Sequence, residues 1–466
     1  MEPNPAAFGV RSWFHLEFPL AGRDRTKPSN ESSMNLASLL SFRKMHKLRL
    51  TNSLWELIGA YFALKSGKLT KGEKTEIFER RFKEIYGCHW VKIFPHARTG
   101  VHAILKALKL EPGDEVIMTP LTIADMINSI HTAGLKPRFM DVSLETLNVD
   151  LEAFEKAITP RSKVLLITYV LGVVPNIEAI VARAKKHGLF VIEDCSQCYL
   201  GEYRGKLAGT FGDATVVSLT NFKVVASLFG GAVMLNNDQI KDSLEATFEE
   251  IVKPPKNDIM LGQTKKNLIY SVFFSRFLFS YATFFLIYLL EKRFPGISYR
   301  LYSGNIRVII DGAVEYRLLD HLPEQYYWDF TDIQAELGLA SLERAPFQTA
   351  KRRENSNRLL NELADLPDFK MLHPIDGANN VYWRFPILST RSKELQAHLL
   401  ESGVDTSPTY LTVCSNEKGF ATYHQPTPNA QYFKEKSLLF EVHGEIAPGD
   451  LNRLIRLVRE FYQKGS

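Results

Sequence analysis

Two stretches of the chain decide its fold: Val191-Ile-Glu-Asp-Cys-Ser-Gln197 and Ala214-Thr-Val-Val-Ser-Leu-Thr-Asn-Phe-Lys223. Each begins with a short apolar run, which is typical of a strand buried inside a sheet. The first stretch then ends in an acid and an amide, and the second ends in a serine with a lysine just beyond it. We therefore expect two neighbouring strands with chemically active groups at their carboxyl ends.

Four side chains stand at these strand ends: Asp194, Gln197, Ser218 and Lys223. An acid, an amide, a hydroxyl and an amine are the groups that pyridoxal 5′-phosphate (PLP) requires. The amine of Lys223 would form a Schiff base with the aldehyde of PLP. The carboxylate of Asp194 would pair with the pyridinium nitrogen and keep it protonated, so that the ring can withdraw electrons. The two stretches therefore predict a PLP site.

Short apolar runs alternate with amphipathic segments from about residue 90 onward. The expected strands cover residues 89–94, 115–119, 138–142, 163–170 and 189–192, and the expected helices cover 99–110, 124–132, 151–158 and 177–187. This alternation predicts βαβ units and a largely parallel sheet that is covered on both faces. Ligands of such sheets bind at the carboxyl ends of the strands, where the four polar side chains are expected.

Composition bounds the class of protein. The 466 residues exceed the usual limit of a single core and predict at least two lobes. An apolar fraction of 45% and a charged fraction of 23% are ordinary for a globular protein, so a disordered or fibrous class is excluded. The net charge of +5 is small and does not indicate nucleic-acid binding. Four scattered cysteines indicate a reducing compartment, and neither a metal site nor a secretory signal is predicted.

Many short motifs, in a consistent order, resemble the DegT/StrS family of sugar aminotransferases. They include Glu111-Pro-Gly-Asp-Glu-Val-Ile117, Gly134-Leu-Lys-Pro137, Thr146-Leu-Asn-Val-Asp150, Gly212-Asp213 and Thr331-Asp-Ile-Gln-Ala-Glu-Leu-Gly-Leu339. The resemblance covers roughly residues 50–250 and 326–466. It implies the aspartate-aminotransferase-like fold, which is an α/β fold with a large, mainly parallel sheet domain and a smaller C-terminal α+β domain. It also implies a homodimer with active sites near the subunit interface.

The resemblance assigns a role to each of the four strand-end residues. Lys223 would be the Schiff-base lysine and would carry the proton between the two carbons of the transfer. Asp194 would pair with the ring nitrogen, Gln197 would bind near the ring hydroxyl, and Ser218 would bind the phosphate. A lysine at position 223, where the deoxygenating dehydratases of the family have histidine, favours aminotransfer.

The chain departs from the family pattern around the cofactor. His96-Ala97-Arg98 stands where the family has a Ser-Gly-Thr phosphate turn at the start of a helix. Arg98 is expected to pair with the phosphate as a bidentate donor. Thr99 would either supply the missing hydroxyl or cap the helix. Ile123 occupies the position of a ring-stacking aromatic residue, so the cofactor would rest on an aliphatic face.

Residues 251–325 form an apolar insertion that the family lacks. Residues 267–290 are mainly apolar and long enough to cross a hydrocarbon core as a helix, but Ser, Tyr and Thr residues interrupt the run and Arg276 lies within it. We interpret this segment as lying in a membrane interface or dipping into one leaflet. The alternatives are a buried helix in a core or dimer interface, and a true membrane span. The expected domain order is an extension over 1–45, a PLP-binding domain over 46–250, the insertion over 251–325 and the small domain over 326–466.

The hypothesis from the sequence is a PLP-dependent aminotransferase. It would move an amino group, with glutamate the expected donor, to a keto sugar that is nucleotide-linked or lipid-linked. The expected location is the cytoplasm or the cytoplasmic face of a membrane. Two alternatives remain open: a non-catalytic, membrane-associated homologue that keeps the fold, and a PLP-dependent dehydratase or epimerase. Tyr410 and His443 are further candidates for the acceptor site.

Overall fold

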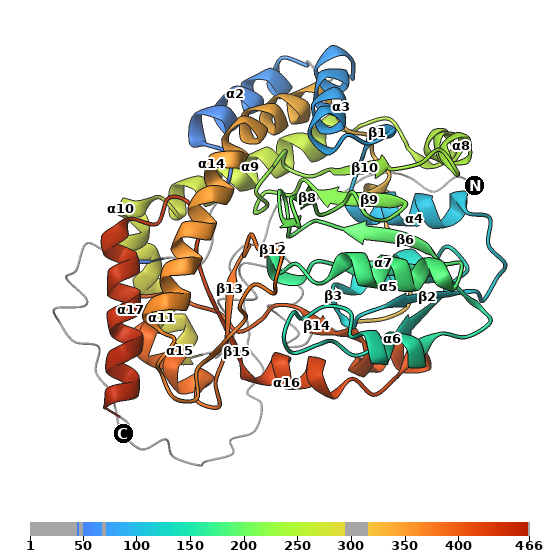
Figure 1. Ribbon diagram of the computed structural model, residues 1–466. Coiled ribbons are helices and arrows are strands. Elements are labelled where there is room, and N and C mark those ends of the chain that lie inside the picture. The colour runs from blue at the N-terminus through green and yellow to red at the C-terminus, as the bar shows by residue number, and fades with distance from the viewer. Residues whose placement is uncertain (1–43, 46–49, 68–70, 294–315, 465–466) are drawn as a thin grey trace, which may run out of the picture.

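A computed structural model describes residues 44–45, 50–67, 71–293 and 316–464 (Figure 1). The extension expected over residues 1–45 therefore lies outside the described residues, except for Lys44 and Met45. Residues 294–315, within the insertion, also lie outside them.

A seven-stranded sheet forms the larger lobe. Its strands, in spatial order, are β1 (Trp90–Phe94), β10 (Gly231–Leu235), β9 (Ala214–Ser218), β6 (Phe190–Asp194), β5 (Ser162–Thr168), β2 (Glu115–Met118) and β4 (Lys136–Phe139). Only β10 runs antiparallel to its neighbours. The expected mainly parallel sheet is confirmed, whereas the antiparallel strand β10 was not foreseen.

Both faces of this sheet are buried because alternate side chains of each strand enter different cores. In β5, Leu165 and Ile167 pack with α3 (Glu73–Tyr86), α6 (Leu151–Ala157) and α7 (Ile177–Lys186). Val164 and Leu166 pack on the opposite face, with α4 (Ala97–Ala107), α5 (Ala124–His131) and α8 (Lys241–Ile251). The helices leave the carboxyl ends of the strands open to a ligand.

The smaller lobe is built on the antiparallel sheet β11 (Lys370–Met371), β13 (Phe385–Leu388) and β15 (Ser437–Phe440). Helices α15 (Ser392–Glu401), α16 (Pro428–Lys436) and α17 (Pro448–Gln463) share its core. The long helix α14 (Asp332–Glu362) runs from the larger lobe into the smaller one, beside α17 (Figure 1).

Two small sheets join the lobes. Strand β3 (Leu121–Thr122) pairs with β14 (Thr412–Val413). Strand β12 (Ala378–Asn379) pairs with β7 (Glu202–Tyr203), which pairs in turn with β8 (Lys206–Leu207). In both sheets, strands from residues 121–207 pair with strands from residues 378–413, so the lobes are held together by backbone hydrogen bonds.

The two ends of the insertion are fastened to each other. Lys253 and Trp328 form a parallel bridge, in which the Lys253 N–H donates to the Tyr327 carbonyl at 2.7 Å and the Asp329 N–H donates to the Lys253 carbonyl at 2.8 Å. An insertion that leaves and returns at one point disturbs the parent fold little, because the strand and helix connections on either side keep their positions.

The insertion folds into helix α9 (Asn257–Phe273), helix α10 (Arg276–Leu278), a π-helical turn (Phe279–Thr283) and helix α11 (Phe284–Arg293). Met260 of α9 packs against α2 (Leu54–Lys65), and Phe284 lies in a small cluster that Leu400 of α15 contacts. Among the described residues, no single helix has the length and apolarity of a membrane span. Helix α9 and the segment Arg276–Leu290, bent by 56°, meet that criterion only as a pair.

Gly231 allows β10 to lie directly against the first turn of α4. A Cβ atom at this position would lie 2.2 Å from the Ala97 backbone nitrogen, a contact that neither backbone can relieve. We predict that Gly231→Ala lowers the free energy of unfolding by about 1–3 kcal/mol. Gly59→Ala on α2, where nothing lies within 4 Å of the added atom, should be neutral or stabilise by about 0.5–1 kcal/mol. Equal urea midpoints for the two variants would contradict this packing.

Candidate active site

A cavity of about 360 Å³ lies at the carboxyl ends of β5, β6 and β9, and residues of both lobes line it. Its volume is within the range of small-molecule sites. Six of the seven site residues expected from the sequence line this cavity: Arg98, Ile123, Asp194, Gln197, Ser218 and Lys223. Thr99 does not, because it lies one residue further along α4 and its hydroxyl donates to the Tyr326 carbonyl at 2.6 Å.

Asp194 is the last residue of β6 and is held in register by Thr168 of β5 and Val216 of β9. Its side chain is only 6% exposed, and one carboxylate oxygen accepts the Ser196 N–H at 2.9 Å. Burial raises the pKa of this carboxyl group, while the Ser196 contacts and the charge of Lys223 lower it. Asp194 is therefore a buried acid whose charge depends on a cation in the same cavity.

Lys223 follows β9 in a turn, and its amine lies 4.1 Å from the centre of the Trp383 ring. Burial lowers the pKa of this amine from 10.5 to about 8. The negative charge of Asp194 opposes that shift, and the positive charges of Arg384 and Arg98 add to it. The amine is thus mainly protonated at neutral pH, but its neutral, nucleophilic form is far more populated than that of an exposed lysine.

The turn that carries Lys223 is fastened from three parts of the chain. The Thr51 hydroxyl donates to the Lys223 carbonyl at 2.6 Å, and the Trp383 indole N–H donates to the Phe222 carbonyl at 2.8 Å. The Asn221 amide donates at 2.8 Å to Asn267, which belongs to helix α9 of the insertion. The insertion therefore touches the backbone segment that positions the lysine.

The cavity is also lined by an amide, from Gln197, and by several hydroxyl groups. The side-chain oxygen (Oε1) of Gln197 accepts the Leu171 N–H at 2.8 Å, so the side-chain NH₂ of Gln197 is the group that remains to donate to a ligand. The Ser218 hydroxyl lies 3.3 Å from the Thr220 hydroxyl, and the Ser218 N–H donates to the Ser196 hydroxyl at 3.0 Å. These groups suit the oxygen atoms of a phosphorylated ligand.

The N-cap residue and the first turn of α4 also line the cavity, through His96, Ala97 and Arg98. His96 is the N-cap residue but makes no side-chain cap hydrogen bond. Burial lowers the pKa of His96 to about 3, so its ring is neutral. Arg98 forms an ion pair with Asp125 and donates to the Tyr326 hydroxyl at 3.1 Å. The expected phosphate donor thus already has an anionic partner from this chain.

Several cavity residues were not foreseen from the sequence. Trp383 and Arg384 enter from the small lobe, and the Arg384 guanidinium pairs with Glu441 at 3.1 Å and donates to Ser407 at 3.3 Å. Tyr410, which was a candidate, also lines the cavity. A signal for the arginine existed, since Trp383 and Arg384 directly precede the apolar run Phe385–Leu388.

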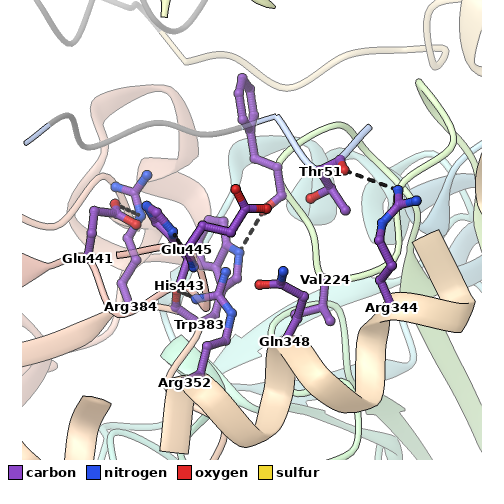
Figure 2. Close-up of a pocket in the computed structure, with 11 residues that line it drawn as sticks. Thr51, Val224, Arg344, Gln348, Arg352, Trp383, Arg384, Glu441, His443 and Glu445 are labelled. Atoms are coloured by element: carbon purple, nitrogen blue, oxygen red, sulfur yellow. Dashed lines mark hydrogen bonds and ion pairs between the residues drawn. The ribbon is translucent and has the colours of Figure 1, made fainter. Parts of the chain in front are cut away.

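A second, smaller cavity of about 40 Å³ adjoins the first and shares Phe222, Trp383 and Arg384 with it. Figure 2 shows that Gln348 and Arg352 reach into it from helix α14. Arg352 donates to the Trp383 backbone carbonyl at 2.6 Å and so holds the backbone at that residue. His443, the other acceptor-site candidate, lines this small cavity and not the large one.

Comparison with known proteins matches the chain to one family model, the DegT/DnrJ/EryC1/StrS aminotransferase family, over residues 60–254 and 326–459. The chain is 26% identical over 408 residues to the spore coat polysaccharide biosynthesis protein SpsC of Bacillus subtilis, covering 85% of this chain and 92% of that protein. It is 33% identical over 173 residues to GDP-perosamine synthase of Escherichia coli O157:H7, covering 37% of this chain and 48% of that protein.

Solved structures share the fold. Helicobacter pylori PseC, an aminotransferase involved in pseudoaminic acid biosynthesis, superposes with a TM-score of 0.66 at 20% identity, covering 91% of this chain and 99% of that one. The aminotransferase from Psychrobacter cryohalolentis superposes with a TM-score of 0.68 at 21% identity, covering 88% and 97%.

A lysine and an acid in one cavity, at the carboxyl ends of a mainly parallel sheet, are typical of the class of PLP-dependent enzymes. The chain belongs to the DegT/DnrJ/EryC1/StrS aminotransferase family. The donor set of the cavity fits PLP, because it offers an amine, a buried acid, an amide, several hydroxyls and the free N–H groups of a helix N-terminus. The sequence resemblance, the fold class and the cofactor are confirmed.

The opposed charges of Lys223 and Asp194 predict a pH dependence. Below about pH 8 the amine is mainly protonated, and above it mainly neutral. The reaction of Lys223 with an acylating reagent, followed by mass spectrometry on the cofactor-free protein, should therefore rise through a midpoint near pH 8. Asp194→Asn should move the midpoint lower, because the aspartate charge favours the ammonium form. Asp238→Asn, at an exposed position far from the cavity, should leave it unchanged. A midpoint near 10.5 would contradict the proposed environment.

Proposed function

We propose that this aminotransferase moves the amino group of glutamate to a keto sugar, and that it works as a homodimer. The observation that carries the proposal is the shared cavity of Lys223 and Asp194 at the ends of the adjacent strands β9 and β6. The family match and the likeness to SpsC and GDP-perosamine synthase support a sugar as the acceptor. The acceptor would be nucleotide-linked or lipid-linked.

When bound, PLP supplies an aldehyde that takes up the amino group and a pyridinium ring that withdraws electrons from the reacting carbon. Asp194 would hold the proton on the ring nitrogen, and the Gln197 amide would donate near the ring hydroxyl. Ser218 and Arg98 would bind the phosphate oxygens at the first turn of α4. Ile123 would offer an aliphatic face to the ring.

Lys223 would move the proton in each half of the transfer. A general acid–base group works best when its pKa is near the working pH, and burial brings the pKa of this amine to about 8. The contacts of Thr51 and Trp383 with the backbone on either side of the amine would keep it within reach of the reacting carbon.

The half-reaction with L-glutamate tests this function without knowledge of the sugar. PLP-loaded protein should release one equivalent of 2-oxoglutarate, with a change in the visible absorption of the bound cofactor. Lys223→Ala should slow that release by about 10²–10⁴-fold or more. Lys186→Ala, at an exposed position of α7, should be unchanged.

The other outcomes separate the alternatives. A colourless protein that takes up no added PLP would overturn the proposed enzymatic function and favour a non-catalytic homologue. The observation that supports this alternative is the ion pair between Arg98 and Asp125. A protein that binds PLP but releases no 2-oxoglutarate would favour a dehydratase or epimerase.

We also propose that the insertion rests on an anionic membrane surface. Most of the large exposed apolar side chains of the described residues lie on α2 and the insertion: Leu54, Trp55, Phe62, Ile269, Val272, Phe273, Phe277, Tyr281, Phe285, Leu286 and Leu289. No acidic residue occurs from Ile259 to Leu290, and the charged residues there are Lys265, Lys266 and Arg276. Apolar side chains beside basic ones are the composition of interfacial helices that bind anionic lipid.

Vesicle flotation tests the membrane proposal. The protein should float with phosphatidylcholine vesicles that contain phosphatidylglycerol, and high salt should weaken the binding. Phe277→Glu combined with Leu286→Glu should weaken vesicle binding by at least about tenfold, since each change removes an exposed apolar side chain that the lipid would bury. Phe347→Glu, at an exposed phenylalanine of α14, is the control. A wild-type protein that stays in the aqueous phase and self-associates would favour an interface between copies instead.

A further inference from the structure

Three side chains from three elements meet at the first turn of α4. Arg98 of α4 pairs with Asp125 of α5, and the Tyr326 hydroxyl bridges them, accepting from Arg98 at 3.1 Å and donating to Asp125 at 2.9 Å. The Arg98 guanidinium also lies over the Tyr326 ring, 4.8 Å from its centre. The cluster stands at the edge of the large cavity, which Arg98 lines and Asp125 does not.

An arginine in the first turn is unusual for a helix, because the N-terminus already carries partial positive charge. Helix α4 has no acidic residue in that turn and no side-chain cap. The N–H groups and the Arg98 guanidinium therefore suit an anionic ligand, and an anion bound at this turn would interact with both. In the structure, the anion that Arg98 contacts is the carboxylate of Asp125.

We propose that the Asp125 carboxylate competes with the cofactor phosphate for Arg98. Asp125 forms an ion pair with Arg98 in the absence of phosphate, and this pair breaks when a phosphate group binds Arg98. This inference rests on the proposed function, because it assumes that PLP occupies the cavity.

The exchange is inexpensive because the pair is not deeply buried. The Arg98 and Asp125 side chains are 21% and 31% exposed, and pairs of this kind are weakly stabilising. Once released, the Asp125 carboxylate can be solvated at the place it already occupies. A phosphate dianion carries more negative charge than a carboxylate, and it also accepts hydrogen bonds from the N–H groups of α4. Arg98 therefore binds the phosphate in preference to Asp125. The competition nevertheless weakens the net affinity for PLP.

The comparison of PLP with pyridoxal tests the inference, because pyridoxal has the same ring and aldehyde but no phosphate. Equilibrium dialysis of the purified protein gives both dissociation constants, without any assay of activity. Asp125→Asn should tighten PLP by about three- to tenfold, the range expected for removing one partly exposed ion pair. It should change pyridoxal binding less than about twofold. Arg98→Gln should weaken PLP and leave pyridoxal unchanged.

Two controls make the result specific. Asp125→Asn introduced into the Arg98→Gln background should no longer tighten PLP, since the competition acts through the arginine. Glu178→Gln, which breaks the exposed ion pair with Arg204, should alter neither constant. Inorganic phosphate should raise the melting temperature of the Asp125→Asn protein more than that of the wild type, which gives a readout independent of Lys223.

The outcomes separate this inference from the proposed function. A wild-type protein that binds neither PLP nor pyridoxal overturns the proposed function. A wild-type protein that binds PLP, combined with an Asp125→Asn variant that binds it equally or more weakly, overturns the role of Asp125 while the proposed function stands.

Discussion

The attraction between the Asp194 carboxylate and the Lys223 amine is the interaction on which the rest of this site depends. Both groups are withdrawn from water, so each is costly when charged alone, and each lowers the cost of the other. The sheet makes this possible, because parallel pairing of β6 with β9 brings the carboxyl ends of the two strands to the same edge. An acid on one strand and an amine beyond the other then face a single cavity.

The small lobe completes that environment. Trp383 lies against the amine of Lys223 and also binds the backbone before it, while Arg352 holds the Trp383 carbonyl from α14. Burial withdraws the amine from water and lowers its pKa, and the charge of Arg384 from the small lobe lowers it further. The lowered pKa of Lys223 is therefore a product of both lobes, and the backbone pairing of β3 with β14 keeps the lobes in a fixed relation.

The insertion is fitted to the fold without breaking it. Its ends meet at Lys253 and Trp328, and α9 packs on α2. The buried amide of Asn267 is the point at which it touches the turn that carries Lys223, through Asn221. A shift of α9 would therefore displace that turn, because the hydrogen bond between the two amides tolerates little movement. The same helices leave a row of apolar side chains exposed.

The sequence by itself determined the alternation of strands and helices, the mainly parallel sheet, and the positions of Asp194, Gln197, Ser218 and Lys223. These follow from local patterns, since a buried strand and an amphipathic helix each show their period within a few residues. The cavity also includes Arg98 and Ile123, as expected, whereas Thr99 bonds to the Tyr326 carbonyl outside the cavity lining.

Only the tertiary structure decided which groups face those residues. Three contacts join residues that lie 27, 160 and 46 positions apart in the sequence: Asp125 with Arg98, Trp383 with Lys223, and Asn267 with Asn221. No local period records such a contact, because it depends on how the lobes and the insertion pack. The antiparallel strand β10 was missed for the same reason: a short apolar strand does not show its direction until its neighbours are known.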